Sequence, residues 1–134
     1  MDANASDKKS LRILLVEDNK INQMVASRLL EKMGHQVSVA ENGKIALDWI
    51  AKNEADLILM DLQMPIMDGI TAAKEIRKWE QAEQRSPIPI IAATANTSEQ
   101  DQANAYGAGM NDFLSKPLRG EVIRQAIERQ VQVA

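Results

Sequence analysis

Short apolar runs alternate with amphipathic stretches along this chain from Leu11 onward. The apolar runs predict β-strands at residues 11–16, 36–40, 56–60, 88–93 and 112–115. Apolar residues at helical spacing predict helices at residues 20–33, 44–52, 69–83, 99–106 and 119–131. A run that is apolar throughout, such as residues 57–60, is typical of a parallel sheet that is covered by helices on both faces.

Regular alternation of strands and helices indicates a parallel sheet with right-handed crossovers. We therefore predict an α/β fold with a doubly wound, flavodoxin-like sheet of five strands in the order 2-1-3-4-5, together with five helices. In this order the first and third strands are neighbours, and a ligand binds beyond their carboxyl ends. Neither an internal repeat nor a second domain is evident in the pattern.

The predicted helices differ in how much apolar surface they offer to a core. In three of them the apolar residues at helical spacing are Ile21, Met24, Val25, Leu29 and Met33, then Ile45, Trp49 and Ile50, then Val122, Ile123, Ala126, Ile127 and Val131. The helix at 99–106 offers little more than Ala103, Ala105 and Tyr106. We expect it to be among the least stable elements. His35, after the helix-ending Gly34, is interpreted as a surface turn residue.

Composition narrows the classes of function. The chain has 134 residues, the size of one domain, and we interpret the polar residues 1–10 as a flexible leader before a domain at 11–134. The net charge of −3 and the lack of a basic tract argue against direct nucleic-acid binding. The absence of cysteine excludes disulfides and cysteine-ligated zinc. No apolar stretch of membrane-spanning length occurs, and we expect a cytoplasmic protein without a membrane partner.

Chemically active side chains follow four of the predicted strands. Glu17 and Asp18 follow the first strand, Asp61 the third, Thr94 the fourth and Lys116 the fifth. The carboxyl ends of parallel strands share one edge of a sheet, so we expect these side chains to form one cluster. A single acidic residue at a strand end is usually a solvated loop residue, but a set at four strand ends predicts a site.

Three carboxylates in one cluster need more positive charge than one lysine supplies. Each pair near 4 Å repels by about 4 kcal/mol at a surface-like dielectric. A divalent cation offsets this repulsion, and an all-oxygen site favours Mg²⁺, or Mn²⁺, over zinc. Phosphate oxygens commonly complete the shell of Mg²⁺, which predicts phosphoryl transfer. Asp61 is the candidate nucleophile, because carboxylates form aspartyl phosphates.

Across about Leu11 to Val131 the chain resembles the receiver domain of two-component response regulators. The resemblance rests on four segments: Val-Glu-Asp-Asn at 16–19, Met-Asp-Leu-Gln-Met-Pro-Ile-Met-Asp-Gly at 60–69, Thr-Ala at 94–95, and Asn-Asp-Phe-Leu-Ser-Lys-Pro at 111–117. Residues 17–22 are similar to those of receivers attached to hybrid sensor kinases.

The resemblance implies a role for each residue of the predicted cluster. Asp61 would accept a phosphoryl group from a phosphohistidine on a histidine kinase or a histidine phosphotransfer protein. Asp18, Asp61 and the backbone carbonyl of Gln63 would bind Mg²⁺ directly. Glu17, where an aspartate is frequent in the family, would act through a bound water.

The resemblance also implies a switch that reports the phosphorylated state. Thr94 and Lys116 would bind phosphoryl oxygens, and Phe113 would turn inward as Thr94 moves. Many relatives carry tyrosine in place of Phe113, so coupling here would rest on packing alone. The Lys116–Pro117 bond is often cis in the family, which proline makes inexpensive.

We therefore predict a phosphorylation-activated signalling switch with slow autodephosphorylation, which is not an enzyme acting on an outside substrate. The thin helix at 99–106 follows Thr94, so we expect the surface at residues 95–131 to contact a downstream protein. The domain would be a monomer or a weak, phosphorylation-dependent dimer. It would be either free-standing or part of a hybrid histidine kinase.

Other classes of protein share parts of this pattern. A metal-dependent aspartyl-phosphate phosphatase also uses an aspartate after a parallel strand, but it needs a second aspartate where this chain has Gln63. A nucleotide hydrolase needs a glycine-rich loop that ends in Gly-Lys-Ser/Thr, and Gly43-Lys44-Ile45 lacks the hydroxyl. A flavin-binding electron carrier would share the architecture, but the acidic crevice would repel the flavin phosphate unless a metal ion lay between them. Only the intact set of Asp61, Thr94 and Lys116 argues against an interaction module that cannot be phosphorylated.

Overall fold

The computed structural model describes residues 10–131, and its strands form one parallel sheet. The elements are β1 (Arg12–Val16), α2 (Lys20–Lys32), β2 (Gln36–Ala40), α3 (Gly43–Lys52), β3 (Leu57–Asp61), α4 (Gly69–Ala82), β4 (Ile90–Thr94), α5 (Glu99–Gly107), β5 (Asp112–Ser115) and α6 (Gly120–Gln130). The strand order is β2-β1-β3-β4-β5, and every pairing is parallel. The predicted fold class and strand order are confirmed. Apart from Ser10, the predicted leader lies outside the described residues.

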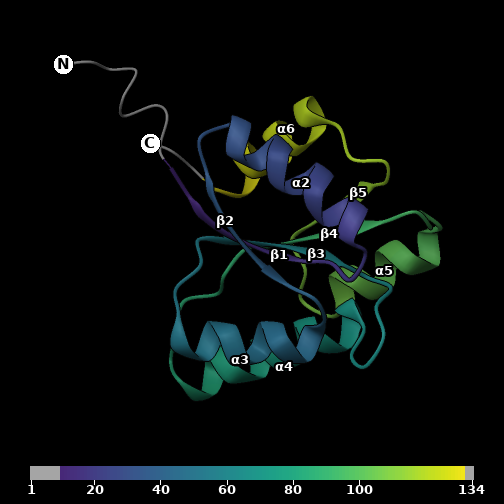
Figure 1. Ribbon diagram of the computed structural model, residues 1–134. Coiled ribbons are helices and arrows are strands. Elements are labelled where there is room, and N and C mark those ends of the chain that lie inside the picture. Colours follow the sequence, from purple (N-terminus) through teal and green to yellow (C-terminus); the bar gives the residue numbers. More distant parts are fainter. Residues whose placement is uncertain (1–9, 132–134) are drawn as a thin grey trace.

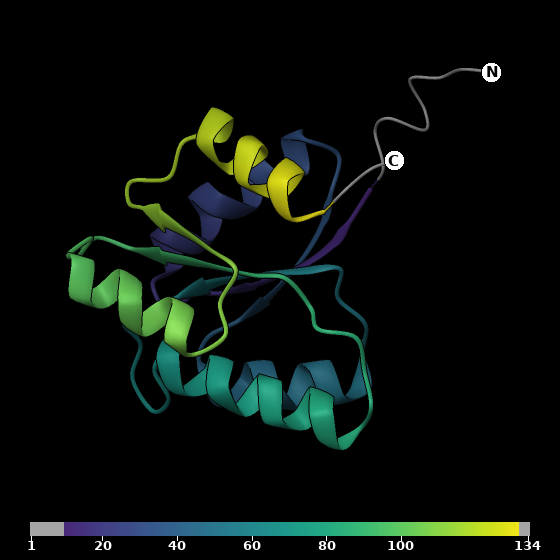
Figure 2. The same cartoon turned by 180° about the vertical axis from the view of Figure 1, so that it is seen from behind.

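Helices cover both faces of the sheet. Helices α2 and α6 lie on one face, and α3, α4 and α5 lie on the other (Figure 1, Figure 2). Alternate residues of each strand enter the two cores, as the period of two requires. In β1, for example, Ile13 and Leu15 pack under α2 and α6, whereas Leu14 and Val16 pack under α3 and α4. This arrangement leaves the ends of the strands uncovered by the helix layers.

Strand β3 is the centre of the molecule. All five of its residues are buried, and it pairs with β1 on one side and β4 on the other. Its last residue, Asp61, still belongs to the ladder, opposite Ala93 of β4. A strand that is fixed on both edges and both faces holds the side chain at its end in a defined position.

The structure corrects several of the predicted inward positions. Five residues expected at the core are exposed: Ile21, Met24, Val25, Ile45 and Val122. Helix α2 faces the sheet through Ala26 and Leu30, so at 3.6 residues per turn its first three apolar residues point away from the core. In α3, Ala46 and Ile50 occupy the buried stripe instead of Ile45. The spacing of apolar residues predicted where these helices lie in the sequence, but it did not predict which face of each helix packs against the sheet.

The helix at 99–106 was also predicted with too wide an apolar face. Only Ala105 of α5 is buried, while Ala103 and Tyr106 are exposed. His35 departs from prediction in the opposite direction: it is partly buried, and its Nδ1 accepts a hydrogen bond from the Leu11 backbone N–H at 3.1 Å. Burial lowers the pKa of the His35 imidazole.

Within residues 10–131, no helix is both long enough and apolar enough to cross a bilayer.

Candidate functional site

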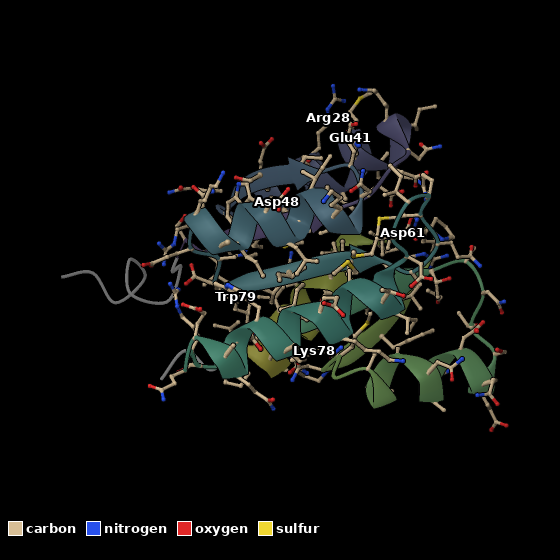
Figure 3. The ribbon with its side chains drawn as sticks, turned by 90° about the horizontal axis from the view of Figure 1, so that it is seen from below. Arg28, Glu41, Asp48, Asp61, Lys78 and Trp79 are labelled. Carbon is tan, nitrogen blue, oxygen red and sulfur yellow. The ribbon has the colours of Figure 1, made fainter. Side chains whose placement is uncertain are left out.

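The predicted cluster of charged side chains lies beyond the carboxyl ends of the central strands. Glu17 and Asp18 follow β1, and Asp61 ends the adjacent strand β3. Figure 3 shows Asp61 at the end of the sheet opposite Trp79. One carboxylate oxygen from each of the three residues lies within 4.8 Å of the other two. The prediction that these residues come together is therefore confirmed.

The three carboxylates differ in their exposure to solvent. Glu17 and Asp61 are buried, with 4% and 5% of their surface exposed, whereas Asp18 is exposed. The cluster, called the acidic pocket below, therefore has two buried carboxylates and one that solvent reaches. Access of solvent to Asp18 suits a cation that keeps some of its water.

Lys116 reaches into this pocket from the loop after β5. Its Nζ lies 2.9 Å from Glu17 Oε1 and 3.4 Å from Asp61 Oδ1. The backbone N–H of Lys116 donates to the carbonyl of Thr94 at 2.9 Å, which fixes the start of the loop. The Lys116–Pro117 peptide bond is cis, as the family resemblance implies.

Burial and charge shift the pKa values of the two groups that meet here. Burial raises the pKa of the Asp61 carboxyl from 3.8 to about 6; the Gln63 N–H, which donates to Asp61 Oδ1 at 3.2 Å, lowers it, and the charge of Glu17 raises it further. Burial lowers the pKa of Lys116, but its hydrogen bond to Glu17 and the charge of Asp61 outweigh that effect, and the net shift is upward. The pocket thus disfavours a second full negative charge and favours the ammonium.

Thr94 and Phe113 lie on the side of the pocket next to α5. Thr94 ends β4 and is 1% exposed, and its Oγ1 accepts a hydrogen bond from the Asn96 N–H at 3.1 Å. Phe113 of β5 pairs with Ala92, and both belong to the core under α5. Because Thr94 lies two residues beyond Ala92, it projects on the same side of the sheet as Phe113. Thr94 and Phe113 therefore share the face of the sheet that α5 covers.

The loop from β3 to α4 folds tightly back against Asp61. A Cβ atom on Gly69 would lie 2.3 Å from the Asp61 carbonyl oxygen, so no other residue fits there without a shift of the backbone. Ile66 has a left-handed φ of 70°, which is unusual for a β-branched residue. The N–H of Gly43 donates to the Met67 carbonyl at 3.3 Å and supports the loop from α3. Sequence analysis did not identify this support, since only the fold brings Gly43 next to the loop.

The donor atoms of the pocket fit a hard divalent cation. The set consists of carboxylate oxygens from Glu17, Asp18 and Asp61, without histidine or cysteine. Lys116 offsets part of their charge and leaves a net negative pocket. Oxygen-only ligands with an exposed mouth suit Mg²⁺, which retains several waters in protein sites.

Comparison with known proteins agrees with this site. Residues 13–128 match the response regulator receiver domain family. The chain is 42% identical over 126 residues to the hybrid signal transduction histidine kinase K of Dictyostelium discoideum, an alignment that covers 91% of this chain and 10% of that protein. The chain spans 10–15% of the length of the first curated relatives it matches.

Two solved structures are also similar. The receiver domain of the sensor histidine kinase PA1611 from Pseudomonas aeruginosa PAO1, with a magnesium ion coordinated in its active-site cleft, gives a TM-score of 0.81 at 38% identity over 91% of this chain and 98% of that one. The Saccharomyces cerevisiae Ssk1 receiver domain, in complex with the histidine phosphotransfer protein Ypd1, gives 0.85 at 34% identity over 90% and 88%. The chain belongs to the family of response regulator receiver domains, the phosphoryl-receiving modules of two-component and phosphorelay systems.

Proposed function

We propose that Asp61 is the phospho-acceptor of this receiver domain and takes its phosphoryl group from a protein phosphohistidine. The observation that carries the proposal is the convergence of Glu17, Asp18 and Lys116 on the buried Asp61 carboxylate. The domain then acts as a switch whose only chemistry is on itself. It works either as a free-standing protein or within a hybrid histidine kinase.

The transfer is a displacement at phosphorus. An oxygen of Asp61 forms the new O–P bond while the N–P bond to the donor histidine breaks, and the leaving imidazole keeps the electron pair and takes up a proton. Asp61 Oδ1 is held by the Gln63 N–H, so we assign the attack to Oδ2. We assign Lys116 and the Thr94 hydroxyl to two phosphoryl oxygens after transfer, because Lys116 already contacts Asp61 and Thr94 ends the strand next to β3. The left-handed turn at Ile66 and the close approach of Gly69 keep the loop in place meanwhile.

A bound Mg²⁺ fits the same pocket. Asp18, Asp61 and the Gln63 carbonyl would hold it directly, with Glu17 acting through a water. When bound, the ion neutralises charge on the phosphoryl oxygens. Mn²⁺ meets the same preference for oxygen ligands.

A labelling experiment separates this function from that of a phosphatase. With Mg²⁺ and acetyl phosphate, the receiver is expected to incorporate at most one phosphoryl group per chain, measured by intact-protein mass. Incorporation should disappear when a chelator removes Mg²⁺. Rapid release of many equivalents of phosphate per chain, with no phosphorylated protein accumulating, would indicate a phosphatase instead.

The exposed apolar start of α2 offers a docking surface for the donor protein. Ile21, Met24 and Val25 are 68%, 48% and 46% exposed, and α2 begins two residues after Asp18. A protein that brings a phosphohistidine to Asp61 must pass the mouth of the pocket, beside this surface. The yeast complex of a receiver with Ypd1 supports a histidine phosphotransfer protein or histidine kinase domain as the donor.

Replacing Met24 by glutamate is therefore expected to slow phosphotransfer from a donor protein by on the order of tenfold, since docking buries this side chain. Phosphorylation by acetyl phosphate should be unchanged, because a small donor needs no docking surface. Lys44→Glu, on the exposed side of α3, is the control for added negative charge. Equal slowing with both donors would show that the substitution acts on the pocket rather than on docking.

We further propose that α5, β5 and α6 form the output surface. Helix α5 has little buried surface and begins five residues after Thr94, so we expect a small change at Thr94 to move it. The same surface is our candidate for weak dimer formation after phosphorylation.

A further inference from the structure

Helix α5 is fastened to the rest of the domain at its C-terminal end. Two nitrogens of Arg77 in α4, Nε and Nη2, donate to the Gly109 carbonyl at 2.9 and 2.7 Å. Gly109 lies two residues beyond the end of α5 and has a φ of +99°. A Cβ atom there would lie 2.8 Å from Arg77 Cγ and 3.1 Å from Arg77 Nε, so a larger residue would displace the Arg77 side chain. Figure 2 shows α4 and α5 on the same side of the sheet.

The guanidinium of Arg77 is itself held in place. Its Nη1 donates to Glu80 Oε1 at 2.8 Å, and Glu80 is only 2% exposed. The other Glu80 oxygen accepts the Ile88 N–H at 2.7 Å. Arg77 Nη2 also donates to Asn111 Oδ1 at 2.9 Å, and the same oxygen accepts the Ile90 N–H. An ion pair with a buried carboxylate resists displacement, because breaking it leaves the Glu80 charge buried and unpaired.

The N-terminal end of α5 is held very differently. Residues 95–100 are exposed, and the side-chain hydrogen bonds around the first turns stay within the segment. Ser98 Oγ accepts the Asp101 N–H, Gln102 donates to the Thr97 carbonyl, and Gln100 donates to Asn104. Ala105, the buried residue of α5, lies near the fastened end. The free end begins five residues after Thr94.

From this contrast we infer that Arg77 is the pivot of the switch. When Thr94 binds the phosphoryl group, the N-terminal end of α5 moves. The two hydrogen bonds from Arg77 to the Gly109 carbonyl, called the Arg77 fork here, hold its C-terminal end on α4. The helix therefore tilts instead of detaching, and the position of Tyr106 on the output surface depends on the fork. This inference rests on the proposed phosphorylation of Asp61. It gives Arg77 a positioning role: Arg77 decides which end of α5 moves, in addition to stabilising the fold.

Amide hydrogen exchange on the whole chain, with and without Mg²⁺ and acetyl phosphate, tests the pivot. In the parent protein, phosphorylation should change exchange in residues 95–104 by on the order of tenfold and leave residues 105–111 unchanged. Arg77→Lys keeps the charge beside Glu80 but loses the two-pronged contact, so the change should spread into residues 105–111. Asn111→Asp keeps the oxygen that accepts from Arg77 and should behave like the parent.

Intact mass, measured on the same samples, separates the two proposals. If no phosphoryl group is incorporated, the proposed function fails and the pivot fails with it. If the phosphoryl group is incorporated but exchange changes evenly over residues 95–111 of the parent, the pivot alone is wrong. The pivot is also wrong if phosphorylation of Arg77→Lys still changes exchange in residues 95–104 and leaves residues 105–111 unchanged. The parent comparison stands by itself if the Arg77 variant folds poorly.

Discussion

Asp61→Asn is expected to abolish Mg²⁺-dependent phosphoryl incorporation and, at the same time, to make the metal-free protein more stable by about 3 kcal/mol at pH 7. The loss follows because an amide cannot form the acyl phosphate. The gain follows because burial raises the pKa of Asp61 to about 6. At pH 7 the ionised Asp61 carboxylate therefore destabilises the folded state, and asparagine removes that charge. Intact mass checks the first effect, and urea unfolding without metal checks the second.

The pH dependence of that gain has a definite sign. Between pH 3.8 and about 6 the folded protein retains a proton on Asp61 that the unfolded chain releases, so this group makes the parent less stable as pH rises. Above about 6 the cost is constant, and below 3.8 it vanishes. The stability difference between Asp61→Asn and the parent should therefore shrink toward zero as pH falls to 4. It should also shrink when Mg²⁺ is added at pH 7, since the ion stabilises only the parent carboxylate set fully.

Asp68→Asn is a useful control for the loss of an aspartate outside the pocket. Asp68 caps α4 by accepting the Thr71 N–H at 2.8 Å, and asparagine caps helices equally well. The difference in stability between Asp68→Asn and the parent should therefore change little with pH or Mg²⁺. An Asp61→Asn protein that is less stable than the parent at neutral pH, without metal, would contradict the account of the pocket.

Lys116→Met is expected to have the opposite effect on stability, with a loss of about 3 kcal/mol in the metal-free protein. Methionine fills a similar length but leaves Glu17 and Asp61 buried without the ammonium that lies 2.9 and 3.4 Å away. Because the folded-state pKa of Lys116 is raised, its contribution is complete at neutral pH and is lost only as pH rises through that raised value. Urea unfolding at pH 7 measures the loss.

Removal of Lys116 should also tighten Mg²⁺ binding, since a positive charge leaves the pocket that receives the ion. Mg²⁺ should then restore much of the lost stability. Lys116→Arg keeps the positive charge, so both the loss of stability and the gain in Mg²⁺ affinity should be smaller than in Lys116→Met. Weaker Mg²⁺ binding by Lys116→Met, measured by calorimetry, would mean that Lys116 organises the metal ligands rather than competing with the ion.

Much of the fold follows from patterns that are local in the sequence. The predicted strands fall on the observed ones, although β3 begins at Leu57 and extends to Asp61, and β4 begins only at Ile90. The alternation of elements was sufficient to predict the strand order, and the strand order predicted that Asp18 and Asp61 would meet. Ends shift by a residue or two because ladder pairing, such as Asp61 with Ala93, decides where a strand stops.

The remaining features depend on contacts between distant parts of the chain. An apolar residue such as Met24 has the same spacing whether it faces the core or a partner, so sequence periodicity misplaced it. The fork from Arg77 to Gly109 joins residues 32 apart, and no local pattern marks it. No local pattern shows that Gly43 and Gly69 allow close packing, whereas in the structure both permit a close approach to the loop that follows Asp61.

Chemical mapping of the phosphorylated residue tests the central claim most directly. Borohydride reduces an acyl phosphate of aspartate to homoserine, which peptide mass spectrometry locates. After treatment with Mg²⁺ and acetyl phosphate, we expect homoserine at position 61 and none in samples that contain a chelator. Homoserine at position 18 instead, or a phosphoryl group that survives borohydride on a serine or threonine, would contradict the account.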